Sequence, residues 1–223
     1  WDQRVVDWIN RVRVQMRSGV IAPGAIHDCR SVLDEMRLIK GMDELQIMQR
    51  AADISTQAHR RAMQTTRPGM REYQIEAELL YTFYRHGAQA PAYTSIVAGG
   101  ANACVLHYVD NRDELKSGDL LLIDAGCELD GYASDITRTF PVNGKFTAAH
   151  KAVYELVLAA QAAAIAQVKP GNHWNDPHQA ALNVLAQGFI DLGLCQGSVE
   201  AVLESEDYKR FYMHRTGHWL GMD

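Results

Sequence analysis

Residues 120–140 read LLLIDAGCELDGYASDITRTF, and this stretch decides the fold. Apolar and β-branched residues flank an Asp-Gly pair at 130–131, which is the strongest short-range signal for a β-hairpin with a two-residue turn. With those two residues in the turn, the facing pairs are fixed: Leu129 with Tyr132, and Asp124 with Thr137. The sequence therefore predicts two antiparallel strands joined at Asp130-Gly131.

The hairpin brings two carboxylates together. Side chains alternate along a strand, so Asp135, two residues from Thr137, lies on the same face as Asp124 and is its diagonal neighbour. Diagonal neighbours have Cα atoms roughly 7–8 Å apart. Two carboxylates that close on apolar strands repel each other unless a positive charge lies between them. Taken alone, the hairpin fits a metal site and a solvent-facing acidic pair equally well.

The rest of the chain contains an internal repeat in the order of its predicted elements, which we call the echo. Apolar periodicity predicts helices over 42–66 and 71–86, and again over 147–168 and through 180–189 towards Gly193. The first helix of each pair stops at a Pro-Gly pair, at 68–69 and at 170–171. We interpret the echo as two helix–helix–sheet units in an α+β domain whose helices cover one face of a curved antiparallel sheet. Strands are expected at 95–99 and 120–140, and the second set is expected to begin at 211–221.

The composition excludes several classes of function. Lys and Arg number 22 and Asp and Glu number 27, so a net charge of −5 gives no basic surface for nucleic acid. No apolar run approaches the roughly 18 residues of a membrane span, so no membrane partner is expected. Four scattered cysteines without a Cys-x-x-Cys pair predict free thiols in a reducing, cytoplasmic compartment. Strand parity turns Cys127 away from Asp124 and predicts a buried structural thiol.

Three histidines carry candidate roles. His107 precedes a polar loop and, taken alone, is typical of an ordinary loop histidine. His214 and His218 form a His-x-x-x-His pair, but no Glu follows the first His and Gly217 interrupts the spacing, so the zinc-protease helix motif is not matched. A strand-and-turn setting with the two rings used separately fits better. The other histidines are expected on helix surfaces or in loops without a role: His27, His59, His86, His150, His173 and His178.

The motifs together resemble a known family. DAG at 124–126, SDITRTFP at 134–141 and HWLG at 218–221 are similar to aminopeptidase P, over residues from about 37 to 223. The resemblance implies the pita-bread fold, with a pseudo-twofold axis that would account for the echo. It also implies a dinuclear metal site built from two Asp, one His and two Glu ligands.

The resemblance implies individual roles as well. Asp124, Asp135 and His218 match metal ligands, with Asp135 bridging both ions. His107 and His214 match catalytic histidines that line the site without binding metal, and Tyr93, with His107, matches the substrate side. Two divalent ions are implied, with Mn²⁺ expected and Co²⁺ or Zn²⁺ as alternatives; carboxylate and imidazole ligands suit these three better than a soft ion such as Cu⁺. The implied substrates are peptides with proline in second position, and a homo-oligomer is expected.

The resemblance also divides the chain. Residues 1–36 match the end of an N-terminal domain and its linker helix, and 37–223 match a catalytic pita-bread domain. The two glutamate ligands are expected beyond Asp223, which would leave these 223 residues inactive alone, and Trp1 is not expected to be the native start. Two alternatives stay open: a prolidase with the same metal site and a different pocket, and a non-catalytic peptide-binding module.

Overall fold

The computed structural model describes residues 1–222, and the chain divides into two compact units, the first covering Trp1–Lys40 and the second beginning at Gly41. The boundary lies four residues beyond the expected one at 36/37. The first unit holds helix α1 (Asp2–Arg13), the short 3-10 helix η1 (Met16–Ser18) and helix α2 (Arg30–Leu38). No side chain of α1 or α2 is fully buried.

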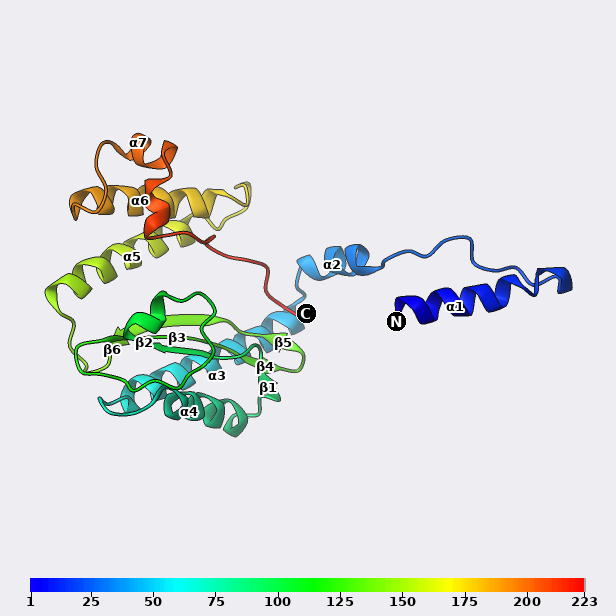
Figure 1. Cartoon of the computed structure of the whole chain (residues 1–223), viewed down its shortest axis with the longest axis horizontal. Coiled ribbons are helices and arrows are strands. Elements are labelled where there is room, and N and C mark those ends of the chain that lie inside the picture. Colours follow the sequence, from blue (N-terminus) through cyan, green and yellow to red (C-terminus); the bar gives the residue numbers. More distant parts are fainter. Residues whose placement is uncertain (223) are drawn as a thin grey trace. The chain divides into compact units, whose positions relative to one another are not determined.

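The second unit is built on antiparallel strands, seen edge-on in Figure 1. One three-stranded sheet has the order β1-β4-β5 and the other the order β2-β3-β6. The strands are β1 (Ala90–Pro91), β2 (Ile96–Gly99), β3 (Leu120–Ala125), β4 (Cys127–Leu129), β5 (Tyr132–Ala133) and β6 (Ile136–Pro141). Leu129 pairs with Tyr132 and Asp124 with Thr137, which confirms the predicted register.

The predicted hairpin bends where one sheet passes into the other. Gly126 separates β3 from β4, and Ser134 lies opposite, between β5 and β6. A Cβ atom at position 126 would lie 1.6 Å from the carbonyl oxygen of Ser134, so the two chains approach each other more closely there than any side chain permits. Register is kept through the bend, because the amide of Ser134 donates to the carbonyl of Cys127 at 2.9 Å.

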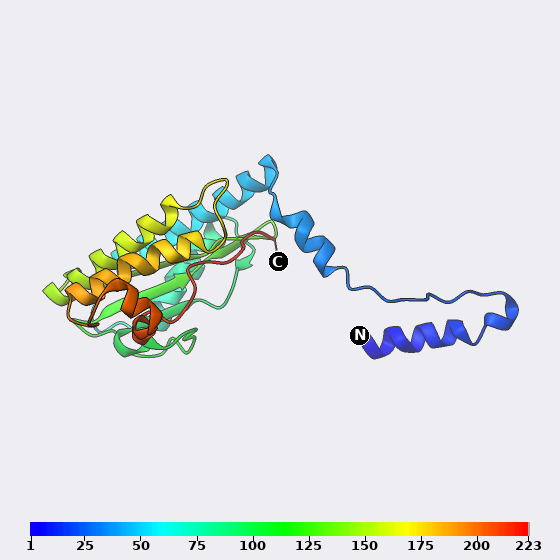
Figure 2. The same ribbon diagram turned by 90° about the horizontal axis from the view of Figure 1, so that it is seen from above.

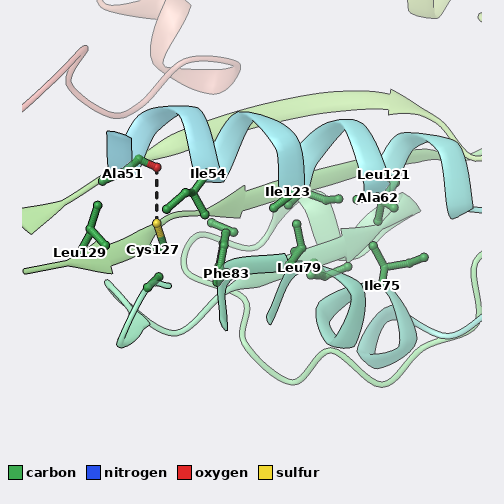
Figure 3. Close-up of a cluster of buried hydrophobic side chains, with 14 of the residues drawn as sticks. Ala51, Ile54, Ala62, Ile75, Leu79, Phe83, Leu121, Ile123, Cys127 and Leu129 are labelled. Carbon is green, nitrogen blue, oxygen red and sulfur yellow. Dashed lines mark hydrogen bonds between the residues drawn. The ribbon is translucent and has the colours of Figure 1, made fainter. Parts of the chain in front are cut away.

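Two helices cover one face of these strands. Helices α3 (Met42–Thr65) and α4 (Glu72–Arg85) pack against each other and against the strands, close to the predicted bounds. The core between them is drawn in Figure 3, where apolar side chains from both helices and from β3 meet. Fully buried members include Ala51, Ile75, Leu79, Phe83, Leu121, Ile123 and Cys127. Burying such side chains stabilises the fold by about 1.5–3 kcal/mol for each large one.

The second helical pair is also confirmed. Helices α5 (Ala148–Ala166) and α6 (Asp176–Asp191) run side by side in Figures 1 and 2 and share a second core with α7 (Val199–Glu204). The hydroxyl of Thr147 accepts from the amide of His150 at 3.1 Å and so caps the N-terminus of α5. Gly188 lets α5 approach closely, because a Cβ there would meet Leu156 at 2.2 Å.

The strands expected to begin at 211–221 are not formed within the described residues. This segment follows the 3-10 helix η3 (Asp207–Arg210), and its backbone pairs with the hairpin through an isolated bridge between Tyr132 and Met222. Gly221 accepts a 2.9 Å hydrogen bond from the amide of Ala133, so the segment ends on the edge of the short strand β5. A two-residue edge offers too few hydrogen-bonding groups to order a longer strand.

Two other expectations bear on the chain as a whole. None of the helices in the described part is long and apolar enough to cross a bilayer. All four cysteines are free thiols, with Cys29 and Cys104 exposed and Cys127 and Cys195 buried. The thiol of Cys127 donates to the carbonyl of Ala51, 3.4 Å away, as befits a structural role.

Candidate metal centre

A tyrosine hydroxyl joins the two aspartates of the hairpin. The hydroxyl of Tyr93 lies 2.6 Å from Oδ1 of Asp124 and 2.8 Å from Oδ1 of Asp135. Asp124 stands on β3, and Asp135 immediately precedes β6, so the hairpin register carries both carboxylates to one face. Tyr93 reaches them from the loop between β1 and β2. The predicted convergence of the two carboxylates is therefore present.

The three groups are electrostatically coupled. A single O–H cannot donate fully to two acceptors, so two ionised carboxylates around it are short of positive charge. Burial raises the pKa of Asp124, opposed by the Tyr93 hydrogen bond and reinforced by the charge of Asp135. Burial and both carboxylates raise the pKa of Tyr93, which keeps the phenol protonated. The cluster favours any species that brings positive charge, a proton or a cation.

His218 joins this cluster from the far end of the chain. Its Nε2 lies 2.9 Å from Oδ2 of Asp135, across 83 positions of sequence. Nδ1 lies 2.7 Å from the carbonyl oxygen of Trp219. That carbonyl raises the pKa of His218, and the charge of Asp135 adds to the effect, against some desolvation. With Nδ1–H donating to that carbonyl, Nε2 of the protonated ring donates to Asp135, and its lone pair is available to a cation once that proton has left.

Contacts with α6 and its preceding loop hold the segment that carries His218. Trp219 stacks on Trp174 with ring centroids 4.4 Å apart. The hydroxyl of Thr216 lies 2.7 Å from Nδ1 of His178 and 3.0 Å from the hydroxyl of Tyr212. His178, expected to have no role, therefore helps to place the chain between His214 and His218.

His107 and His214 are not joined to the acidic pair. Among the described residues, neither makes a hydrogen bond to Asp124 or Asp135. His107 is exposed in the loop after β2 and has a positive φ of 56°. Nδ1 of His214 contacts the carbonyl oxygen of Arg215 at 2.9 Å, and its ring packs edge-on against Tyr212.

The chemistry of the cluster fits a divalent metal. Two carboxylates and one imidazole are the donors that Mn²⁺, Co²⁺ and Zn²⁺ accept, and the coupling described above is relieved by a cation. Across residues 1–222, however, no three His, Cys, Asp or Glu side chains form a group that could hold an ion as they are placed. Tyr93 occupies the space between the carboxylates, so its hydroxyl has to move aside before both can turn to one ion.

Sequence reasoning missed four buried polar side chains: His59, Ser55, Ser134 and Glu72. His59 was expected on a helix surface, and this is wrong: it is 3% exposed, and its Nδ1 lies 2.9 Å from the carbonyl oxygen of Ser55. Ser55 itself meets Ser134 under the bend of the hairpin. Glu72 is fully buried at the start of α4. Only Ser134 carried a signal in the sequence, as the neighbour of Asp135.

Comparison with known proteins places the chain in a family. The model of metallopeptidase family M24 matches residues 46–223, and the chain belongs to this family. The Xaa-Pro aminopeptidase of Haemophilus influenzae is 52% identical over 198 residues, covering 89% of this chain and 46% of that protein. The Escherichia coli Xaa-Pro aminopeptidase is 42% identical, covering 96% and 49%.

Solved structures agree with the fold. The aminopeptidase PepP of Pseudomonas aeruginosa has a TM-score of 0.96 at 52% identity, covering 100% of this chain and 50% of that one. Zinc-substituted Escherichia coli aminopeptidase P in complex with product has a TM-score of 0.95 at 42% identity, covering 98% and 50%. The predicted α+β pita-bread fold is confirmed. The chain spans about half the length of the relatives it matches.

Proposed function

We propose that the protein containing this chain is an Xaa-Pro aminopeptidase, a hydrolase that removes the first residue from peptides with proline in second position. The observation that carries the proposal is the chain of contacts that joins Asp124 to Asp135 through the Tyr93 hydroxyl and Asp135 to His218, in a chain of metallopeptidase family M24. Relatives named Xaa-Pro aminopeptidase support the proline preference over a prolidase.

In this proposal the acidic cluster holds the metal. Asp124, Asp135 and His218 would hold two divalent ions, with Asp135 as a ligand of both, and two glutamates implied by the resemblance to aminopeptidase P would complete the ligand set. Manganese is the proposed metal. When bound, such ions polarise the peptide carbonyl and lower the pKa of water so that hydroxide is available near neutral pH. The hairpin register keeps the two aspartate side chains on one face, so binding would require the Tyr93 hydroxyl to move aside without any change of strand register.

Other side chains act on the substrate. His107 and His214 are proposed to donate hydrogen bonds to the oxygen that gains charge as the peptide bond breaks, since both are exposed and free of the carboxylates. Tyr93 is proposed to contact the substrate with the hydroxyl that leaves the carboxylates. A neutral phenol is a hydrogen-bond donor, and the raised pKa of Tyr93 keeps it in that form.

The setting of the enzyme is part of the proposal. Free thiols and a net charge of −5 support a cytoplasmic protein that acts on peptides and binds neither nucleic acid nor membranes. A homo-oligomer is proposed from the resemblance to aminopeptidase P.

The test is Asp135→Asn in the protein made from its complete gene. Asparagine keeps the shape and loses the charge, so hydrolysis of an Xaa-Pro-Xaa tripeptide should be abolished and bound manganese, measured by mass spectrometry of the metal, should fall. Asp130→Asn, in the turn of the same hairpin, is the matched control and should retain both, since asparagine accepts its positive φ of 51°. Normal turnover and full metal content in Asp135→Asn would refute the proposal.

A further inference from the structure

A fully buried carboxylate lies at the first position of α4. Glu72 is 0% exposed and accepts four hydrogen bonds. Oε1 accepts from the amide of Gly99 at 2.8 Å and from Nδ2 of Asn102 at 3.0 Å. Oε2 accepts from the hydroxyl of Tyr108 at 2.7 Å and from the amide of Asp113 at 3.0 Å. Four donors and a helix N-terminus are what an ionised carboxylate needs to stay buried.

All four donors belong to one loop. Gly99 ends β2, where the loop begins, and Asp113 stands at its far end, so two backbone amides tie both ends of the loop to the same side chain. Asn102 lies in the 3-10 helix η2 (Gly100–Cys104), and Tyr108 lies at the middle of the loop. Glu72 therefore fixes the start, the middle and the end of residues 99–113.

The tip of this loop has little other support. Val105, Leu106 and Val109 are 56%, 60% and 48% exposed, so apolar packing does not order the tip. His107 has a positive φ of 56°, a conformation that a histidine adopts only where its surroundings hold it. Tyr108, the next residue, is the nearest anchored position to it. Burial and the charge of Glu72 raise the pKa of Tyr108 to about 12, so the phenol remains a donor at neutral pH.

Taken together, these contacts lead us to propose that Glu72 is a positioning residue, which acts through Tyr108 and the loop ends to hold His107 where it meets the substrate. The inference deepens the proposed function and rests on it. Glu72 touches neither substrate nor metal in this proposal. It sets the backbone from which the His107 ring projects, and a misplacement of about 1 Å in such a group is enough to lower a rate by roughly 10²-fold.

The chemistry requires a carboxylate at position 72. Each of its oxygens faces two donors, so an amide would set its own NH₂ group against a pair of N–H or O–H donors. Glu72→Gln is thus close in shape and wrong in polarity. Glu76, one turn further along α4, supplies the matched control: it is half-buried, and Glu76→Gln makes the same change of charge on the same helix at a side chain that, among the described residues, forms no hydrogen bond with the loop.

A double-mutant cycle with His107 in the protein made from its complete gene tests the proposal. Glu72→Gln should lower kcat for an Xaa-Pro peptide by about 10–100-fold with bound metal unchanged. In a His107→Ala background the same change should lower kcat by less than about 3-fold, because the group that it positions is already gone. Glu76→Gln should change neither kcat nor the amount of bound metal. Equal losses in the two backgrounds would show that Glu72 does not act through His107.

A second measurement does not depend on activity. Amide hydrogen exchange in residues 100–113 should accelerate at least about tenfold in Glu72→Gln, with α3 and β3 unchanged. If Glu72→Gln fails to fold, Tyr108→Phe replaces it, because it removes only one donor. This variant should also lower kcat and accelerate exchange in the loop. Unchanged exchange in the loop would overturn the inference even in an active enzyme. If the parent protein does not hydrolyse Xaa-Pro peptides while loop exchange accelerates in Glu72→Gln, the result would count against the proposed function alone.

Discussion

The side-chain hydroxyls of Ser55 and Ser134 lie 2.7 Å apart beneath the bend of the hairpin, although 79 positions separate them in the sequence. Both are buried, and the amide of Cys127 donates to both, at 3.0 Å and 3.1 Å. Ser134 also donates to the carbonyl of Cys127 at 3.0 Å. Helix α3 is thus bonded to the hairpin one residue before Asp135, at the point where the two sheets diverge.

Removal of the Ser134 hydroxyl should therefore loosen the hairpin. Ser134→Ala leaves a buried carbonyl without its side-chain donor, so the free energy of unfolding should fall by about 1–3 kcal/mol, measured by urea denaturation. Ser55→Ala should cost less, because Ser134 still accepts from Cys127. Thr56→Ala, on the exposed side of α3, is the control and should stay within about 0.5 kcal/mol of the parent. A Ser134→Ala protein as stable as the control would contradict the assignment.

Tyr93→Phe should strengthen the binding of a cation to the acidic pair. The hydroxyl now shares its proton with Asp124 and Asp135 and has to leave before both can turn to an ion. Without it, the affinity for Mn²⁺ should rise by roughly 5–10-fold, equivalent to about one hydrogen bond, as measured by calorimetric titration. Tyr81→Phe, on the exposed outer side of α4, should leave the affinity unchanged. A weaker affinity in Tyr93→Phe would mean that the hydroxyl assists metal binding.

His107→Ala and His214→Ala should separate catalysis from metal binding. If both rings act on the substrate, either change should lower kcat by about 10²-fold or more while manganese content stays at the parent level. His86→Ala, on an exposed helix end, should alter neither. Stoichiometric loss of metal in His214→Ala would instead make His214 a ligand alongside His218.

His59 should make the fold acid-sensitive. Burial lowers the pKa of His59, while the carbonyls of Ser55, Ile123 and Ile136 around the ring oppose that shift only in part. The unfolded chain takes up this proton near pH 6.5 and the folded chain at a lower pH, so the unfolded state binds more protons between the two values. The free energy of unfolding should therefore be fully retained above pH 6.5 and fall as the solution is acidified towards the folded pKa.

A phenylalanine at position 59 isolates the contribution of His59 to the pH dependence of stability. His59→Phe cannot titrate, so its stability should vary less between pH 7 and pH 5 than that of the parent, whatever its stability at pH 8. The comparison is made by urea denaturation at each pH, with His86→Gln as a solvent-exposed control. A parent-like pH dependence in His59→Phe would assign the acid sensitivity to other groups.

Local chemistry explains why the sequence predicted the hairpin so closely. Asp130 and Gly131 both adopt positive φ values, 51° and 83°, and few residues other than Asp, Asn and Gly do so readily. Once that turn is fixed, alternation carries the register outward to Asp124 and Thr137. Thr147 and the Pro-Gly stops act in the same short-range way, so the four helices were predicted to within a few residues.

Interactions between distant segments were beyond the reach of such reasoning. Glu72 reads as an ordinary acidic residue in the first turn of a helix, and only the packed loop reveals its four donors. His59 lies on the side of α3 that packs against the sheet. Apolar periodicity marks this buried side only weakly, because α3 is rich in alanine. The prediction of strands at 211–221 was wrong because the echo gives only the sequence in which elements follow one another. A strand also needs the edge of a neighbouring strand to pair with.

The close approach of Gly126 to Ser134 determines where the hairpin tolerates insertions and deletions during evolution. The turn at Asp130-Gly131 lies beyond the last facing pair, so extra residues there lengthen the loop and leave Asp124 and Asp135 opposite their present neighbours. One residue added between Asp124 and Cys127 would send every following side chain to the other face. Homologous chains should therefore vary in turn length and keep the spacing from each aspartate to the bend.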